Sequence, residues 1–530
     1  MNVTTFSTTD RKSSAHERAA ALDLHPQKAV RDLSPSRLGA RALVEGYPTP
    51  PLERARYLEI GSRSGTNLIA HAVAFPQAFF TAASINEHAD ILSLATQAKA
   101  KNVRTSELDL ASFESSDLET YDFITAADVF STAAIAERMA LLVLAKKHLA
   151  EDGIACICVD VPSGWQVIDN LKAEISQGVE QGGDPHKQVQ LVRARAISLA
   201  NRISAGEISD RQHELGELTR LARASDAEIY RDVLDPNHRA VPIAEFLAMA
   251  DAAKLKPIGD IDPAKSNLDV LPASMRSADS HPQEVADVYT QIDQHTKTKR
   301  RHVLLVHADR ERQSFDLKKA LGSMCLTSGL SREDKSQTDR ALLAGGPITF
   351  AGSLTYRTEN PIEIVALALL EKHKYFPIRA DKLVAHIVAA LKPTGILPAD
   401  PLQVSRAVFS IAQKLLPTGG FVTHMVESRA VSKVGERPIL APLALVQARQ
   451  GASHLASLMP HSIAVDDTAR FILSRLDGTQ TVQQISDELA ETVSKGELSL
   501  MATEGTPQAR AKATTLRVIG HAARSGLLAA

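Results

Sequence analysis

Cysteine is scarce in this chain of 530 residues, which holds only Cys156, Cys158 and Cys325. Three thiols cannot build a disulfide framework, so we expect a reducing compartment. Cys156 and Cys158 lie inside the apolar run from Ile154 to Val159, with no His or Cys cluster beside them. A buried strand explains the pair better than a metal site, and no metal is expected.

Long apolar runs are missing too. The longest, such as Ile364 to Leu370, fall far short of the roughly 18 residues of a membrane-spanning helix. The first twenty residues are rich in Ser, Thr and charge and lack the apolar centre of a signal peptide. We therefore expect a cytoplasmic protein without membrane insertion.

The chain also has no large excess of positive or negative charge. It contains 60 Lys and Arg residues and 62 Asp and Glu residues, which gives a formal net charge of -2. This balance argues against a nucleic-acid partner, which would call for a basic surface. The one dense basic run, Lys297 to Arg301, predicts a solvated edge before the apolar segment that follows, with a phosphate or partner patch as the second interpretation.

The stretch from Tyr57 to Asn67 is the local pattern from which the rest of the chain is interpreted. It reads Tyr-Leu-Glu-Ile-Gly-Ser-Arg-Ser-Gly-Thr-Asn, the pattern of a buried parallel strand that turns into a helix whose first amides hold a ligand. Glycines in such a turn also occur for purely structural reasons. The motif alone leaves both interpretations open.

Short apolar runs and amphipathic segments alternate from Ala55 to Val161. This alternation predicts an α/β fold with an open, doubly wound, mainly parallel sheet. Ligands in such sheets bind beyond the carboxyl ends of the strands, which places Gly61, Ser84, Asp109 and Asp128 around one crevice. The expected strands are 56–60, 78–83, 103–107, 123–127 and 154–159, and the expected helices are 67–75, 87–101 and 135–149.

The remainder divides into three parts. Helical patterns dominate after Trp165, a mixed pattern follows, and Ser462 to Glu491 reads as strand, helix, turn and a capped helix, the layout of a small winged-helix module. The expected units are a flexible segment 1–23, the sheet domain 24–170, a helical domain 171–280, a mixed α/β domain 281–435 and a winged-helix-like domain 436–530.

These residues resemble a known family. Tyr47 to Asn67, Tyr121 to Ile124 and Gly164-Trp165, followed by Asp184-Pro185 and Leu476 to Thr479, are similar to class I S-adenosylmethionine (SAM) methyltransferases that carry a methyltransferase regulatory domain. That group includes rickettsial protein-lysine methyltransferases of outer-membrane proteins. The resemblance runs from about Leu24 to Glu491 and implies a Rossmann-like domain, a helical regulatory domain, SAM as cofactor and a protein or peptide substrate. A homodimer is compatible with it.

The resemblance also implies which residues hold the cofactor. Glu59, Gly61 and Gly65 keep the family pattern, and Asp109 matches the position whose carboxylate accepts from the adenine amine; an N-cap role explains Asp109 equally well. Ser84 stands where the family carries an acid for the ribose, with Glu87 as a substitute. Arg63 replaces a small residue and would clamp the SAM carboxylate or fill the pocket. The implied cofactor-binding set is Glu59, Gly61, Ser62, Arg63, Gly65, Asn67, Ser84, Glu87 and Asp109.

Further departures occur where methyl transfer would take place. After the fourth strand the family shows a His-Gly-Val-Tyr-Ser-Trp pattern, where this chain reads Ala127-Asp-Val-Phe-Ser-Thr132. Before Gly164 the family's aromatic is replaced, giving Asp160-Val-Pro-Ser163. Methyl transfer to lysine needs a neutral amine held in line with the sulfonium. We expect Asp128 and Asp160 to orient the lysine, and Phe130 and Trp165 to wall the pocket; an ordinary core position explains Trp165 as well.

Two functions follow from these observations. The first is a SAM-dependent methyltransferase that acts on lysine side chains of a protein. The second is a protein whose methyltransferase fold has lost catalysis and binds a polypeptide, as the changes at Arg63, Ser84 and Ala127 suggest.

Overall fold

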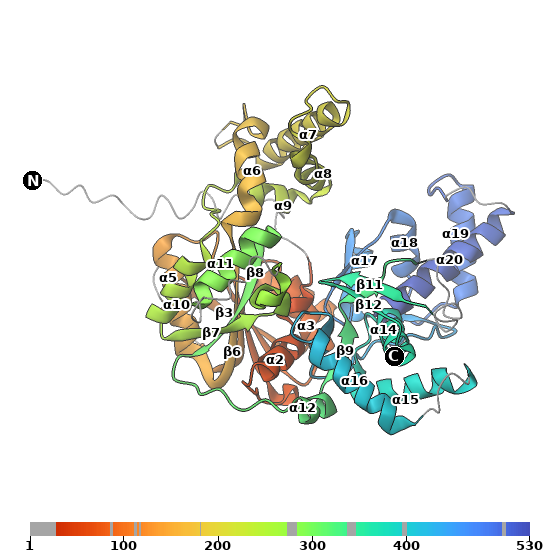
Figure 1. Cartoon of the computed structure of the whole chain (residues 1–530). Coiled ribbons are helices and arrows are strands. Elements are labelled where there is room, and N and C mark those ends of the chain that lie inside the picture. Colours follow the sequence, from red (N-terminus) through yellow and green to blue (C-terminus); the bar gives the residue numbers. More distant parts are fainter. Residues whose placement is uncertain are drawn as a thin grey trace, which may run out of the picture.

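The computed structural model describes residues 28–84, 88–110, 114–115, 118–180, 182–272, 284–335, 346–394, 400–500 and 505–530. The expected flexible segment 1–23 and Glu87 lie outside these ranges. Figure 1 shows the sheet and its helices on one side, the helices α6 to α8 projecting from it, and the part of the chain from β9 onward on the other side.

An eight-stranded sheet forms the first part of the molecule, in the order β4-β3-β2-β1-β5-β6-β8-β7. The strands from β3 to β6 pair in parallel, and β4, β7 and β8 are antiparallel to their neighbours. The predicted doubly wound α/β fold is confirmed. The strands are β1 Arg56–Ile60, β2 Phe79–Ser84, β3 Val103–Asp109, β4 Glu114–Ser115, β5 Tyr121–Ala126, β6 Leu149–Asp160, β7 Leu255–Asp260 and β8 Arg300–His307.

Helices cover both faces of this sheet, because neighbouring strand residues point to opposite sides. Tyr57 and Phe123 pack on the face covered by α2, α3 and α4, whereas Leu58 and Ile124 pack on the face covered by α5 and α10. Continuous apolar strands are what a sheet buried on both faces requires. The helices are α2 Pro35–Val44, α3 Thr66–Ala74, α4 His88–Gln97, α5 Ile135–His148, α10 Ile243–Ala252 and α11 Val285–Thr296.

The sheet does not end where the sequence analysis places its boundary. Strands β7 and β8 come from 255–307, a region assigned above to the helical and mixed domains, and both belong to the same sheet as β6. The pairing of Ala155 with Leu305 joins segments 150 residues apart. The boundaries at 170 and 280 are therefore corrected: the sheet domain resumes after a helical insertion, because strand pairing over such distances leaves no local pattern.

The helical insertion has its own core, in which Leu171 of α6 packs with Val192 of α7 and Leu218 of α8. Proline opens two of its helices at the first turn, where the missing N–H costs nothing. Asp184 caps α7 as its Asp-Pro sequence predicts, by accepting from the His186 amide. The elements are α6 Pro162–Ile175, α7 Pro185–Ser204, α8 Leu215–Arg223, α9 Asp226–Ile229 and a π-helix, Tyr230–Leu234.

Two further cores lie beyond β8. The first joins three-stranded sheets to helices, and its elements are α12 Leu317–Ser323, β9 Cys325–Ser328, β10 Leu330–Arg332, β11 Ile348–Gly352, β12 Thr355–Thr358, α14 Pro361–Lys372, β13 Ile378–Arg379, α15 Ala380–Leu391, α16 Pro401–Leu415 and β14 Phe421–His424. The last holds β15 Ile439–Leu440, α17 Pro442–Arg449, β16 His454–Ala456, β17 Ser462–Ala464, α18 Asp467–Leu473, α19 Val482–Ser494, α20 Pro507–Arg524 and β18 Leu528–Ala529. Thr481 and Gln484 form the predicted capping box at the start of α19.

The predicted buried strand around Cys156 and Cys158 is confirmed. Cys156 and Cys158 are buried in β6, and all three thiols are free. Within the described ranges, no cluster of three or more His, Cys, Asp or Glu side chains is arranged to hold a metal ion. None of the helices in those ranges is long and apolar enough to cross a membrane.

Candidate active site

The loop after β1 makes a tight, left-handed path into α3. Gly61 and Gly65 adopt positive φ angles of 73° and 70°, and Arg63 between them has a φ of 45°. A Cβ atom on Gly61 would lie 2.4 Å from Cγ2 of Val129, so glycine is required there by both backbone and space. Gly65 provides no side-chain cap for α3, although the Ser64 hydroxyl accepts from the Thr66 amide at 3.4 Å. The amides that follow Thr66 in the first turn suit an anion.

The carboxyl of Glu59 lies buried beneath this loop. Its Oε2 accepts a hydrogen bond from Nδ2 of Asn67, and the Ser62 hydroxyl donates to its carbonyl at 2.9 Å. Burial raises the pKa of Glu59 to about 8, against the opposing effect of the Asn67 and Ser62 hydrogen bonds. Asn67 in turn accepts from the Val30 amide at 2.7 Å, which ties the segment before α2 to the loop.

The strand ends lie side by side as the topology predicts. Ile60 is in register with Ala83 of β2 and Ala126 of β5, so Gly61, Ser84 and Asp128 follow neighbouring strands. Asp109 is the last residue of β3 and is half-buried. The structure thus brings the predicted Ser84 and Asp109 to the same edge of the sheet as Gly61.

Asp128 and Asp160 meet one arginine at the ends of β5 and β6. Arg300 Nη1 lies 2.7 Å from Oδ1 of Asp128, while its Nε and Nη2 contact the two oxygens of Asp160 at 2.7 and 3.0 Å. Arg231 of the π-helix adds a second contact to Asp128 at 3.2 Å. Burial alone would raise the pKa of Asp128, but Arg300, Arg231 and Arg63 outweigh it and hold the pKa at about 2.

The basic run at 297–301 is therefore not a solvated edge, and that prediction is corrected. Lys299 pairs with Glu217 of α8 at 2.7 Å, Arg300 holds the two aspartates, and Arg301 is fully buried on Asp293. Sequence analysis missed these side chains, and Arg231 with them. The available signal was a dense group of cations at the start of an apolar strand, where burial demands anionic partners.

Phe130 and Trp165 both lie in the core. Phe130 is buried edge-on against Phe246 of α10, with ring centroids 5.0 Å apart. Trp165 is buried against the His238 ring at 4.4 Å, and its indole N–H donates to the Lys299 carbonyl at 3.0 Å. Core packing thus accounts for both rings, and their role as pocket walls stays a prediction.

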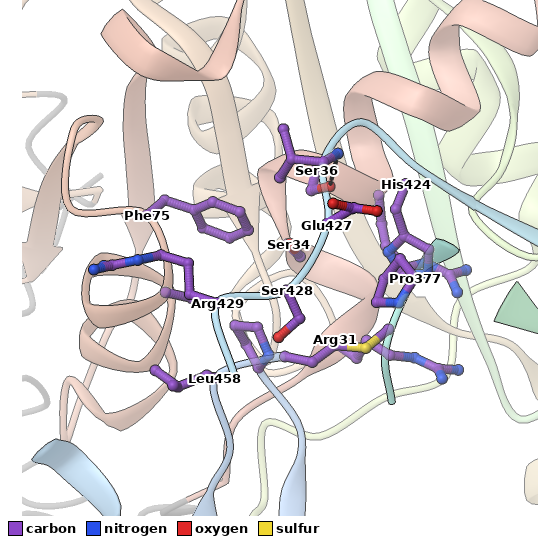
Figure 2. A pocket seen from close by; sticks show the side chains of 15 residues that line it. Arg31, Ser34, Ser36, Phe75, Pro377, His424, Glu427, Ser428, Arg429 and Leu458 are labelled. Atoms are coloured by element: carbon purple, nitrogen blue, oxygen red, sulfur yellow. Dashed lines mark hydrogen bonds between the residues drawn. The ribbon is translucent and has the colours of Figure 1, made fainter. Parts of the chain in front are cut away.

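A separate small pocket lies away from the strand ends. It opens between the segment before α2, the end of α3 and the turn after β14. Figure 2 shows Phe75 and Arg429 on one side of it, with His424 and Pro377 on the other. None of the predicted site residues described by the structure lines this pocket.

Comparisons with known proteins agree with this architecture. Residues 436–527 match the family model described as "PKMT, C-terminal winged helix domain". The Rickettsia prowazekii protein called "Uncharacterized protein RP789" is 20% identical over 88% of this chain and 84% of its own length. The solved structure of PKMT2 from Rickettsia typhi superposes with a TM-score of 0.80 at 17% identity, covering 96% of this chain and 100% of that one. PKMT2 in complex with AdoHcy gives a TM-score of 0.79 at 17% identity, over 95% and 99% of the two chains.

Proposed function

Because the chain carries a PKMT C-terminal winged helix domain and shares the fold of a rickettsial PKMT over nearly its whole length, we propose that it is a SAM-dependent methyltransferase that methylates lysine side chains of a protein. One observation carries the proposal. The strand ends of this fold converge on a glycine loop and the start of α3, and the PKMT2 fold has been seen in complex with AdoHcy.

The residues around β1 fit the amino-acid end of SAM. Gly61 and Gly65 leave room for close backbone approach, and the amides that follow Thr66 in α3 suit a carboxylate. The Asp109 carboxylate would accept a hydrogen bond from the adenine amine, and the Ser84 hydroxyl would form a hydrogen bond with the ribose. When bound, SAM supplies a methyl group on a sulfonium sulfur that leaves as a neutral thioether.

The ends of β5 and β6 are where methyl transfer to the lysine would take place, and we call them the reaction end. Asp128 and Asp160 are both engaged by Arg300, so their role is to hold that arginine and shape the site rather than to receive an ammonium group. This is a change from the role expected above. The acceptor amine must be neutral when it reacts, because its lone pair forms the new bond to the methyl carbon.

The alternative is a non-catalytic protein that uses the same crevice to bind a polypeptide. The ion pairs of Asp128 and Asp160 favour it, because Arg300 already engages the two carboxylates that were predicted to orient the lysine. A methyl-transfer assay separates the two functions.

The test is methyl transfer from SAM that carries a labelled methyl group. Fragments of outer-membrane proteins from a rickettsial bacterium serve as acceptors, since the family resemblance points to them, and mass spectrometry locates the label. We expect labelled lysines, and we expect Asp109→Ala to lose most of the label while Asp309→Ala, on an exposed turn, keeps it. Saturable SAM binding without any labelled lysine would favour the non-catalytic alternative.

A further inference from the structure

We propose that the small pocket beside α2 is a binding site for a phosphate-sized oxyanion. Its wall combines the first turn of α2, the side chain of Arg37 and the turn that follows β14, and Leu458 of the last part of the chain also lines it. The pocket is separate from the crevice at the strand ends, so this inference does not depend on methyl transfer. A ligand bound here would contact three parts of the chain at once.

Arg37 is buried with part of its hydrogen-bonding capacity unused. Its side chain is 7% exposed, and Nη2 lies 3.4 Å from Oδ1 of Asp32 and 3.4 Å from the Ile261 carbonyl oxygen. Asp32 is shared with Arg31 at 3.8 Å and His302 at 3.7 Å. Nε and Nη1 of Arg37 are buried as well, and neither has a hydrogen-bond partner among the described residues. An unpaired buried donor of a charged group is costly, so a ligand that accepts from either nitrogen is favoured.

Arg41, one turn further along α2, shows the contrast. Its side chain is 6% exposed, but its Nε donates to the Asp260 carbonyl at 3.0 Å and its Nη1 contacts the Glu45 carboxylate. Protein groups can therefore satisfy a buried arginine of this helix. Arg37 lines the small pocket, whereas Arg41 does not.

The first turn of α2 adds donors of its own. Ser34 is the N-cap residue, but its side chain makes no cap hydrogen bond, and Pro35 follows it without an N–H. The Ser36 amide is therefore the first N–H of the helix and has no partner within it. Ser34 and Ser36 both line the pocket and are each 3% exposed. A helix start attracts an anion through its amides and its dipole.

Two further arginines lie around the same pocket. Figure 2 shows Arg31 and Arg429 among the side chains that line it. Glu427 is the one carboxylate that lines it in the described part of the chain. Both oxygens of Glu427 are contacted by Nζ of Lys382, at 2.8 and 2.7 Å. This carboxylate therefore already has a cation, and it does not occupy the donors at the start of α2.

Two histidines beside the pocket show the effect of the arginine charges. Burial is the main reason why the pKa of His424 lies well below its ordinary value, and Arg37 and Arg31 lower it further. Burial also lowers the pKa of His461 to about 4, with Arg31 and Lys374 adding to the effect. Both rings are neutral at pH 7. A bound anion would offset the arginine charges that act on them.

Phosphate suits these donors better than a carboxylate does. Its four oxygens point to the corners of a tetrahedron and accept hydrogen bonds from several directions, whereas the two oxygens of a carboxylate lie in one plane. The pocket offers donors from the first turn of α2, from Arg37 and from Ser428 in the turn after β14. Arginine is also a preferred partner of phosphate. Because the pocket is small, the expected occupant is the free inorganic ion.

Three variants separate the site from its surroundings. Arg37→Gln removes the buried guanidinium, and Arg429→Gln removes a cation at an exposed residue, where folding is not at risk. Arg41→Gln is the matched control, because Arg41 lies on the same helix and is as buried as Arg37 but does not line the pocket.

The first measurement is Tm of the full-length chain against phosphate concentration at constant ionic strength. We expect Tm to rise and level off after about 2 °C, as binding to one site requires. Arg37→Gln loses this saturating rise, Arg429→Gln needs several-fold more phosphate to reach it, and Arg41→Gln keeps it. Exclusion of phosphate from the protein surface also raises Tm, but that effect does not level off and acts on every variant alike.

A saturating rise of the same size in the parent chain and in Arg37→Gln overturns the inference, and so does a rise that never levels off. Acetate serves as the carboxylate probe in the same titration. We expect no saturating rise with acetate; saturation at a lower concentration than with phosphate overturns the assignment to phosphate.

The second measurement locates the ion. Arsenate has the shape and charge of phosphate and scatters X-rays anomalously, so crystals of the chain soaked in arsenate show where it binds. We expect an anomalous peak beside Arg37 and the first turn of α2. Peaks confined to other places contradict the site. Neither measurement involves SAM, so a negative result here leaves the proposed function standing, and a failure of methyl transfer leaves this site standing.

Discussion

The carboxyl of Glu59 is an acid that the fold keeps protonated. It lies buried under the glycine loop with Asn67 as its hydrogen-bond donor, and burial raises its pKa to about 8. In the unfolded chain the same group ionises near pH 4.3. Between these two pH values the folded state holds a proton that the unfolded state has released, so the contribution of Glu59 to stability falls as the pH rises.

Replacing this carboxyl by an amide removes that dependence. We expect Glu59→Gln to have little effect on Tm at pH 5 and to raise it at pH 8, because glutamine keeps an acceptor for Asn67 and has no proton to lose. Thermal unfolding at the two pH values measures the difference, which corresponds to about 1.4 kcal/mol per unit of pKa change. A Tm difference independent of pH would mean that Glu59 is ionised in the folded protein.

Gly61 is required for two separable reasons. Alanine at a positive φ costs about 1 to 2 kcal/mol, and its Cβ would also collide with Val129 at 2.4 Å. Gly206 has a similar φ of 79° but nothing within 4 Å of such a Cβ. We expect Gly61→Ala to lower the unfolding free energy by more than Gly206→Ala, by a further ~1 to 3 kcal/mol.

Replacing Val129 by a smaller residue should remove the part of the stability loss that comes from the collision between Val129 and the Cβ atom that Gly61→Ala introduces. In the double variant Gly61→Ala/Val129→Ala only the backbone penalty remains, so its loss of stability should approach that of Gly206→Ala combined with Val129→Ala. Equal losses for the single variants Gly61→Ala and Gly206→Ala would show that Val129 moves aside freely.

Individual site residues were predictable only where they lie next to a local pattern. Gly61, Gly65 and Asp109 follow strands that the apolar periodicity marks. Arg231 and Arg300 were not predictable, because their partners Asp128 and Asp160 lie 103 and 140 residues away in sequence. An ion pair between distant segments leaves no periodic trace.

Strand β8 holds α11 on the sheet. Its residue Arg301 is fully buried; Nε donates to both oxygens of Asp293 at 3.0 and 2.9 Å, and Nη2 donates to the Tyr289 carbonyl at 3.0 Å. Both partners belong to α11. The arginine therefore locks the helix onto the sheet next to the residue, Arg300, that holds the reaction end.

Breaking this pair should be costly. Arg301→Leu leaves the Asp293 carboxylate buried without its cation, and we expect a loss of about 3 to 5 kcal/mol. Thermal or urea unfolding measures it. The double variant Arg301→Leu/Asp293→Leu removes both charges and should recover much of the loss; a double variant less stable than the single one would contradict this account of the pair.

Elements were predicted better than their assembly. The strands and helices between 56 and 160 lie close to their expected ranges. The apolar periods of strands and of helices differ, and each can be recognised within a short stretch of sequence. The assignment of β7 and β8 to separate domains was wrong, since an antiparallel pairing across a long insertion depends on the completed fold. The winged helix was recognisable because its caps and turns are consecutive in sequence.

The stretch from Lys28 to Ser36 connects regions that are distant in sequence. The Ala29 amide donates to the Ser462 hydroxyl at 2.8 Å, Lys28 pairs with Glu228 at 3.0 Å, and the Met425 amide donates to the Ser36 hydroxyl at 2.9 Å. The sheet domain, the helical insertion and the part beyond β8 thus share contacts through one short stretch. A homodimer stays a prediction.

The central claim is that the crevice at the strand ends binds SAM. Calorimetric titration of the purified full-length chain with SAM tests it most directly, with Gly61→Ala as the variant and Gly206→Ala as its control. The account predicts saturable binding at one site, weakened by Gly61→Ala and unchanged by Gly206→Ala. An absence of binding heat and of any SAM-dependent rise in Tm at millimolar ligand would contradict it.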